Sequence, residues 1–178
     1  MKKGIVVSEQ EYLTNPAYEH YEYVGGEVVE KPMGTTKHGR LQVRFCVLLN
    51  AFAESRGMDL ATELHCLLTV GGETVYRLPD VSLIEEAKID SKDHLVGGPT
   101  LAIEIRSPED RTKALLHKAE EYFANGTKLV WIVDPEAKNV MVLVVDRVPW
   151  IIELGEELTG SPFWPELKVD LEAAFRGI

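Results

Sequence analysis

The stretch LPDVSLI at residues 78–84 places an acid, Asp80, directly after a proline and at the start of an apolar run. A second stretch, LAIEIRS at residues 101–107, places Glu104 inside another apolar run. Both runs have the β-branched and apolar composition typical of strands. Acids in such runs are seldom fully buried unless they are paired or bind a metal. The two acids therefore indicate a divalent-metal site suited to phosphodiester chemistry.

Strand geometry predicts how the two acids meet. Side chains alternate between the two faces of a strand, so Asp80 shares a face with Ser82, and Glu104 shares one with Ala102. If the two strands are neighbours, both acids can bind one Mg²⁺ or Mn²⁺, because such an ion needs only one or two carboxylates besides water and phosphate. The alternative is that Asp80 only begins a strand after a proline turn, while Glu104 points to solvent.

A lysine completes the constellation. The helix expected over residues 109–125 has an apolar arc that contains Lys118, whereas Lys113 and His117 fall outside the arc. A lysine in that position either has an anionic partner or extends its ammonium to water. Beside a metal-bound phosphate, Lys118 would orient or help to deprotonate a water, or stabilise the charge that develops at phosphorus.

Composition limits the class of protein. The 178 residues, 45% of them hydrophobic, predict a single domain over residues 1–178 with a sizeable core. Cys46 and Cys66 lack the spacing of a zinc site or disulfide framework. The net charge of −10 argues against nucleic-acid binding by bulk charge, but it permits a nuclease with a local basic rim. No apolar run has the length of a signal peptide or membrane span, so we expect a cytoplasmic protein.

Periodicity and turn residues predict one continuous α/β pattern. A short helix begins at Ser8 and ends before Pro16, and a hairpin turns at Gly25-Gly26. The further expected elements are a helix over 36–55, strands over 64–70 and 74–84, a loop over 85–99, a strand over 100–106, a helix over 109–125, and strands over 128–133 and 140–145. After the hairpin, the predicted order is α-β-β-β-α-β.

With these motifs in place, the chain resembles the restriction-endonuclease-like, or PD-(D/E)xK, nuclease superfamily, and within it the Uma-two family of endonucleases. The matching motifs are the hairpin over 21–30, Pro79-Asp80, AIEIRSPED at 102–110, Lys118 with Tyr122, Asn125-Gly126 and WIVDP at 131–135. The resemblance implies an α/β fold with an α-β-β-β-α-β core. It also implies a mixed central sheet flanked by helices, with an N-terminal hairpin and added C-terminal strands.

One position departs from the superfamily pattern. The motif places a lysine two residues after the glutamate, where this chain has Arg106. Arginine stays protonated and cannot act as a general base, but it can bind phosphate. By resemblance to members whose lysine has moved to the following helix, Lys118 takes the role of the motif lysine. Arg106 would then either bind phosphate or act as a structural partner of Glu104.

Two further residues are candidates. His38 lies at the centre of the apolar stripe of the long helix, so it faces inward, either as a buried core histidine or as a group that accepts a proton or binds phosphate. Glu27 follows the turn glycines, where a solvated hairpin charge is the simple interpretation. The family that the chain resembles has a glutamate just after this turn, so the resemblance adds the alternative that Glu27 is an extra metal ligand.

The basic residues and the C-terminal strands bear on partners. Lys31, Lys37, Arg40 and Arg44 surround the start of the long helix. They either keep its outer face solvated or follow a phosphate backbone. The apolar stretch from Val140 to Leu154, which includes Trp150, predicts a homodimer contact.

Together these features predict an endonuclease dependent on Mg²⁺ or Mn²⁺ that acts on nucleic acid, in the first instance DNA, with inversion at phosphorus. A catalytically silent scaffold that binds nucleic acid or protein is the main alternative, because a fold does not guarantee an activity. A weaker alternative is a small-molecule phosphohydrolase built on the same metal pair.

Overall fold

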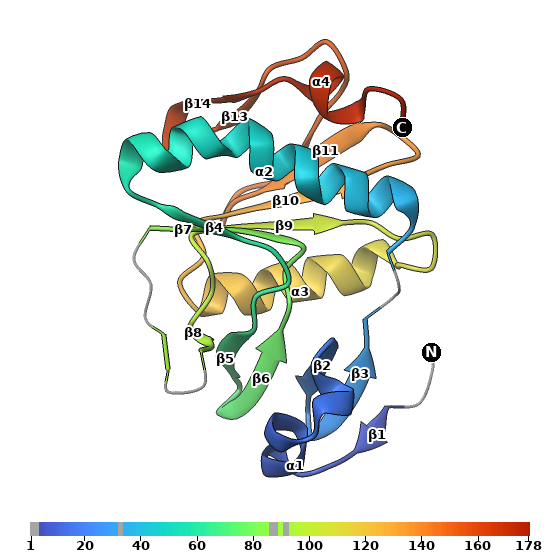
Figure 1. The fold of residues 1–178 in the computed structure, drawn as a ribbon. Helices are drawn as coiled ribbons and strands as arrows, with labels where there is room; N and C mark the ends of the chain where they lie inside the picture. Colours follow the sequence, from blue (N-terminus) through green and yellow to red (C-terminus); the bar gives the residue numbers. More distant parts are fainter. Residues whose placement is uncertain (1–3, 32–33, 86–88, 91–92) are drawn as a thin grey trace.

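The computed structural model describes residues 4–31, 34–85, 89–90 and 93–178, which form a mixed α/β structure (Figure 1). The first of its two six-stranded sheets has the order β1-β3-β2-β6-β5-β8, and the second has the order β12-β11-β10-β9-β7-β4. The first sheet comprises β1 (Ile5–Val6), β2 (Tyr21–Val24), β3 (Glu27–Glu30), β5 (Cys66–Val70), β6 (Glu73–Arg77) and β8 (Leu95–Val96). The second comprises β4 (Asp59–Ala61), β7 (Val81–Ile84), β9 (Leu101–Ile105), β10 (Leu129–Asp134), β11 (Asn139–Leu143) and β12 (Trp150–Ile152). Both sheets are mixed, because β5 pairs with β8 and β9 with β10 in parallel.

Two long helices enclose the second sheet. The helices of the described residues are α1 (Glu9–Thr14), α2 (Thr36–Arg56), α3 (Thr112–Ala124) and α4 (Leu171–Phe175), with a short 3₁₀ turn over Pro16–Tyr18. Figure 1 shows α2 on one side of the second sheet and α3 on the other. Alternation along β9 explains this arrangement: Leu101, Ile103 and Ile105 belong to the core that contains the buried face of α2, whereas Ala102 packs with α3.

Capping residues set the starts and ends of the helices. The Ser8 hydroxyl accepts a hydrogen bond from the Glu11 amide at the start of α1, as the sequence predicts. Thr35 caps α2 in the same way through the His38 amide. Gly57 ends α2 with φ of 63°, a left-handed conformation that glycine adopts without steric cost. The predicted hairpin is also confirmed, with β2 and β3 paired around Gly25-Gly26.

The prediction of one strand over residues 74–84 is wrong. This segment forms two strands, β6 in the first sheet and β7 in the second, separated by residues 78–80. Pro79 has no amide hydrogen to donate to a strand ladder, and it restricts the residue before it. The chain therefore leaves one sheet and enters the other at the Pro79-Asp80 pair.

The predicted α-β-β-β-α-β succession is present, but with different strands. Along the second sheet the order is α2, β4, β7, β9, α3 and β10, and the strand predicted over 64–70 lies in the first sheet as β5. The predicted loop over 85–99 contains β8, and its residues 86–88 and 91–92 lie outside the described residues. Strand β4, the two-stranded sheet of β13 (Leu158–Gly160) and β14 (Trp164–Val169), and helix α4 were not predicted.

The basic residues on the outer face of α2 have a structural use that the sequence did not indicate. Arg44 Nη1 donates to the carbonyl of Ala174 at 2.9 Å, and Arg40 Nη1 donates to that of Gly177 at 3.0 Å. Both arginines thus tie α4 and the C-terminal residues to α2. Within the described residues, no helix combines the length and apolarity needed to cross a membrane.

Candidate active site

Asp80 and Glu104 face each other across two adjacent strands. Strands β7 and β9 are antiparallel neighbours with Val81 opposite Ile103, and continuing this register by one residue places Asp80 opposite Glu104. Both side chains are buried, with relative exposures of 1% and 3%. Asp80 Oδ2 accepts a hydrogen bond of 2.6 Å from the Ile105 amide. The expected pairing of the two acid-bearing strands is therefore present.

Two cationic or polar groups hold the other oxygen of Asp80. Lys31 Nζ lies 2.6 Å from Oδ1, and His38 Nε2 lies 3.1 Å from the same atom. Burial on its own raises the pKa of Asp80, but the hydrogen bond from His38 and the charge of Lys31 outweigh burial and lower the pKa to about 2. Asp80 is therefore fully ionised at neutral pH. His38 is buried as expected, and the bond to Asp80 raises its pKa although burial opposes this.

Glu104 has a different environment. Its Oε1 accepts a hydrogen bond of 2.7 Å from the Tyr122 hydroxyl, and its Oε2 lies 3.5 Å from Lys118 Nζ. Burial raises the pKa of Glu104, and the charge of Asp80 raises it further against the opposing effect of Lys118. The two acids thus have pKa values displaced in opposite directions, a pattern common at functional sites.

Lys118 reaches this site from α3, on the face of the sheet that carries Glu104. Its ammonium lies 2.7 Å from Glu22 Oε1, so it has an anionic partner rather than an extended path to water. Burial opposes its charge, but Glu104 and Glu22 outweigh burial and raise the pKa of Lys118. In this state Lys118 is a protonated charge and hydrogen-bond donor, and it is not a base.

A buried arginine supports Lys118 from behind. Arg77 Nη1 donates to Glu22 Oε2 at 2.6 Å, and Arg77 Nε donates to Glu121 Oε2 at 2.6 Å. All three side chains are buried. Glu22 lies on β2, Arg77 on β6 and Glu121 on α3, so this network fixes the first sheet to the helix that presents Lys118. It also limits how far the Lys118 ammonium can move.

A second possible ligand set shares Asp80. Ligand atoms of His38, Glu63 and Asp80 lie within 4.8 Å of one another. Two carboxylates and an imidazole suit a first-row divalent ion such as Mn²⁺, and carboxylate oxygens alone suit Mg²⁺. Lys31 Nζ lies within this set, 2.6 Å from Glu63 Oε2. Asp80 therefore belongs to two groups of donors that suit a divalent cation. One group is Asp80 with Glu104, and the other is Asp80 with Glu63 and His38.

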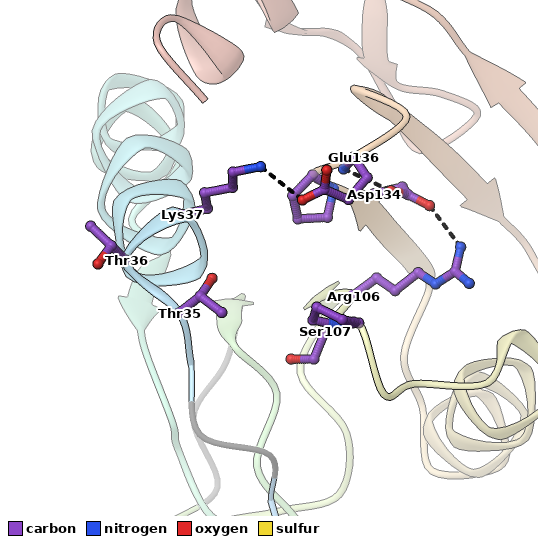
Figure 2. A pocket seen from close by; sticks show the side chains of 9 residues that line it. Thr35, Thr36, Lys37, Arg106, Ser107, Asp134 and Glu136 are labelled. Atoms are coloured by element: carbon purple, nitrogen blue, oxygen red, sulfur yellow. Dashed lines mark hydrogen bonds and ion pairs between the residues drawn. The ribbon is translucent and has the colours of Figure 1, made fainter.

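An open groove lies at the ends of β9 and β10, and its lining includes Arg106, two residues after Glu104. It has a volume of about 590 Å³ and is lined by the start of α2, residues 106–108 and residues 134–136 (Figure 2). Arg106 pairs with Asp134 Oδ2 at 2.7 Å, and Lys37 pairs with Glu136 Oε1 at 2.8 Å. Arg106 thus has Asp134 as its structural partner, and the interpretation that pairs it with Glu104 is wrong.

The structure brings together four of the six predicted site residues, the acid pair and two others, and places the remaining two elsewhere. His38 and Lys118 contact Asp80 and Glu104 respectively, which complete the group. Arg106 lines the adjoining groove. Glu27 lies against Gly4 at the far end of the hairpin, four residues before Lys31 and so about 13 Å from it along an extended chain.

Sequence reasoning missed several members of the site. Glu22 interrupts a β-rich run, YEYV, in the same manner as Asp80 and Glu104, so the same reasoning applied to it would have marked it. Lys31 was noted only as part of a basic stretch. Glu63 gave no local signal, because it lies outside the strands and its backbone takes the left-handed φ of 52°.

The lowered pKa of Asp80 predicts how the metal-free protein responds to acid. Because the folded pKa is below the unfolded value, the ionised carboxylate stabilises the fold by about 2 kcal/mol above pH 4, and roughly half of this is lost by pH 3. In urea unfolding with a chelator, we expect Asp80→Asn to be destabilised most at pH 5 to 7, with the difference from wild type shrinking toward pH 3. A difference independent of pH would contradict the assigned pairing of Asp80 with Lys31 and His38.

Comparison with known proteins identifies a family and a similar solved structure. The sequence pattern of the Uma2 family, described as "Putative restriction endonuclease", matches residues 9–172. A crystal structure of a "putative nuclease belonging to DUF820" from Anabaena variabilis ATCC 29413 has a TM-score of 0.79 and 23% identity. The alignment covers 95% of this chain and 97% of that one, which shows a shared fold. No curated protein matches the chain. Because the family match spans nearly the whole sequence, the chain belongs to the Uma2 family.

Proposed function

We propose that this protein is a metal-dependent endonuclease that hydrolyses phosphodiester bonds, in the first instance those of DNA. The observation that carries the proposal is the buried pair of Asp80 and Glu104 on neighbouring strands, with the ammonium of Lys118 3.5 Å from Glu104. The family description supports the class of reaction. The order of α2, β4, β7, β9, α3 and β10 supports a restriction-endonuclease-like core.

Asp80 and Glu104 would hold the divalent ion, Mg²⁺ or Mn²⁺. When bound, the ion supplies positive charge that polarises a phosphoryl oxygen and lowers the pKa of water. The pKa of Glu104 is raised in the metal-free protein, first by burial and then by the charge of Asp80, and a bound cation would favour the ionised carboxylate in this position. Glu27 lies against Gly4 and is not among the grouped ligand atoms of the described residues, so it contributes no ligand in this proposal.

Lys118 would stabilise the negative charge that develops on the phosphoryl oxygens. Its pKa is raised and its ammonium is held by Glu22, so it offers a fixed positive charge at neutral pH. His38 would orient Asp80 through the 3.1 Å contact. Arg106, which lines the groove at the end of β9, would bind a neighbouring phosphate, for which its guanidinium geometry is suited.

A silent scaffold remains the second candidate, because Lys31 and Lys118 already neutralise part of the acid cluster without any ion. Metal-dependent cleavage separates the two functions. We expect the protein to cleave plasmid or single-stranded DNA with Mn²⁺ and the Asp80→Ala, Glu104→Ala double variant to lose activity. Lys118→Met should lower the cleavage rate by about 100-fold. Lys113→Met, an exposed lysine on the same helix, is the control and should cleave normally. DNA binding without any Mn²⁺-dependent cleavage would favour the scaffold.

Metal binding has its own test. A ligand that binds only the folded protein raises its stability. The melting temperature should therefore rise with Mn²⁺ in wild type and rise less in Asp80→Asn, with a chelated sample as the reference. An equal rise in the two proteins would place the ion away from Asp80.

We also propose that two copies associate through the C-terminal strands. The ring of Trp150 packs against the core of its own subunit, so the contact would rest on the exposed apolar side chains of Val145, Val148, Ile151 and Leu154. A pair of subunits would place two acid sites on one duplex and would double the number of contacts that basic side chains make with phosphates. Light scattering at micromolar concentration should report a dimer, and Val148→Asp should shift it toward monomer. A monomeric wild type would remove this part of the proposal and leave the site unaffected.

A further inference from the structure

The ammonium of Lys31 is surrounded by protein oxygens. Its Nζ lies 2.6 Å from Asp80 Oδ1, 2.6 Å from Glu63 Oε2 and 2.7 Å from the carbonyl oxygen of Leu78. An ammonium has three N–H donors, so these three acceptors satisfy it completely. The side chain is only 11% exposed. Lys31 is therefore coordinated by the protein much as a bound cation would be.

The position of Glu63 is costly to maintain, and several contacts maintain it. Its backbone has a φ of 52°, which is unfavourable for a residue with a Cβ. Its amide donates to the carbonyl of Pro79, and its Oε1 accepts a bond of 2.7 Å from Gln42 Nε2. Pro79, between β6 and β7, and Gln42 on α2 thus hold Glu63 so that its carboxylate faces Lys31.

The oxygens around Lys31 are also those that a divalent ion would use. Asp80 Oδ1 faces both Lys31 and His38, while Oδ2 accepts the Ile105 amide. Each carboxylate oxygen offers about two lone pairs, so Oδ1 has no capacity left for an ion. Two cations a few ångströms apart also repel strongly in a buried site. An ion that binds through Asp80 Oδ1 therefore requires Lys31 to leave.

We infer that Lys31 is a tethered cation that competes with the divalent ion for Asp80 and Glu63, so that the site loads only as the ammonium moves out. This inference rests on the proposed metal dependence of the site. In the metal-free protein Lys31 neutralises the acid cluster and stabilises the fold. In the presence of metal it lowers the apparent affinity, and so sets the ion concentration at which the site becomes occupied.

Chemical labelling of the wild-type protein tests the displacement directly. An amine-acetylating reagent, followed by peptide mass spectrometry, reports the reactivity of each lysine. We expect Mn²⁺ at saturation to raise the rate of Lys31 acetylation several-fold, because the ammonium moves from a buried ion pair to solvent. Lys37, which is half exposed and paired with Glu136, provides the internal reference and should be unchanged. An unchanged Lys31 rate with metal bound would overturn the inference.

Binding measurements give an independent test. By calorimetry, Lys31→Met should bind Mn²⁺ about tenfold more tightly than wild type, because the competing charge is gone. Lys37→Met is the matched control and should bind as wild type does. Equal or weaker binding by a folded Lys31→Met protein would overturn the inference alone. If neither wild type nor Lys31→Met binds Mn²⁺, the proposed metal dependence fails as well. Should Lys31→Met not fold, the labelling result decides.

Discussion

The burial of one carboxylate, Asp80, organises much of this structure. A buried ionised acid is expensive unless it is paired and hydrogen-bonded, and Asp80 is 1% exposed. It meets this requirement through the Ile105 amide, Lys31 and His38. These groups belong to β9, to the segment after β3 and to α2, which are far apart along the chain. Satisfying a single side chain therefore constrains the hairpin, the long helix and the second sheet relative to one another.

The segment that contains Asp80 also explains why two sheets meet at the site. Residues 78–80 carry the chain from β6 in the first sheet to β7 in the second. Arg77, just before this crossover, is bound by Glu22 and Glu121, and Asp80, just after it, is bound by Lys31 and His38. The two ends of the crossover are thus fixed by separate ion pairs. Lys118 and Glu104, which contact each other, lie beside them.

Local patterns predicted the elements that have strong periodicity and clear caps, and they failed where long-range pairing decides the outcome. Helix α2 and strand β9 were predicted nearly to their ends, as was the convergence of Asp80 with Glu104. The break at Pro79 was missed because the residues on both sides of it have a composition typical of strands, and only the choice of strand partner separates β6 from β7. Strand β4 and helix α4, with three and five residues, are too short for periodicity to show. Lys31 and Glu63 become site residues only through tertiary contact.

The balance of charge in the described part of the site argues for an additional cation. Five carboxylates converge there, those of Glu22, Glu63, Asp80, Glu104 and Glu121, and they contact three permanent cations, Lys31, Arg77 and Lys118. The excess is two negative charges, which one divalent cation would balance. In the metal-free protein the pKa of Glu104 is raised by burial and by the charge of Asp80, and the pKa of His38 is raised by its hydrogen bond with Asp80 against the effect of burial. A divalent ion at Asp80 and Glu104 would supply the missing positive charge and favour the ionised form of Glu104, so metal binding and the ionisation of this acid are linked.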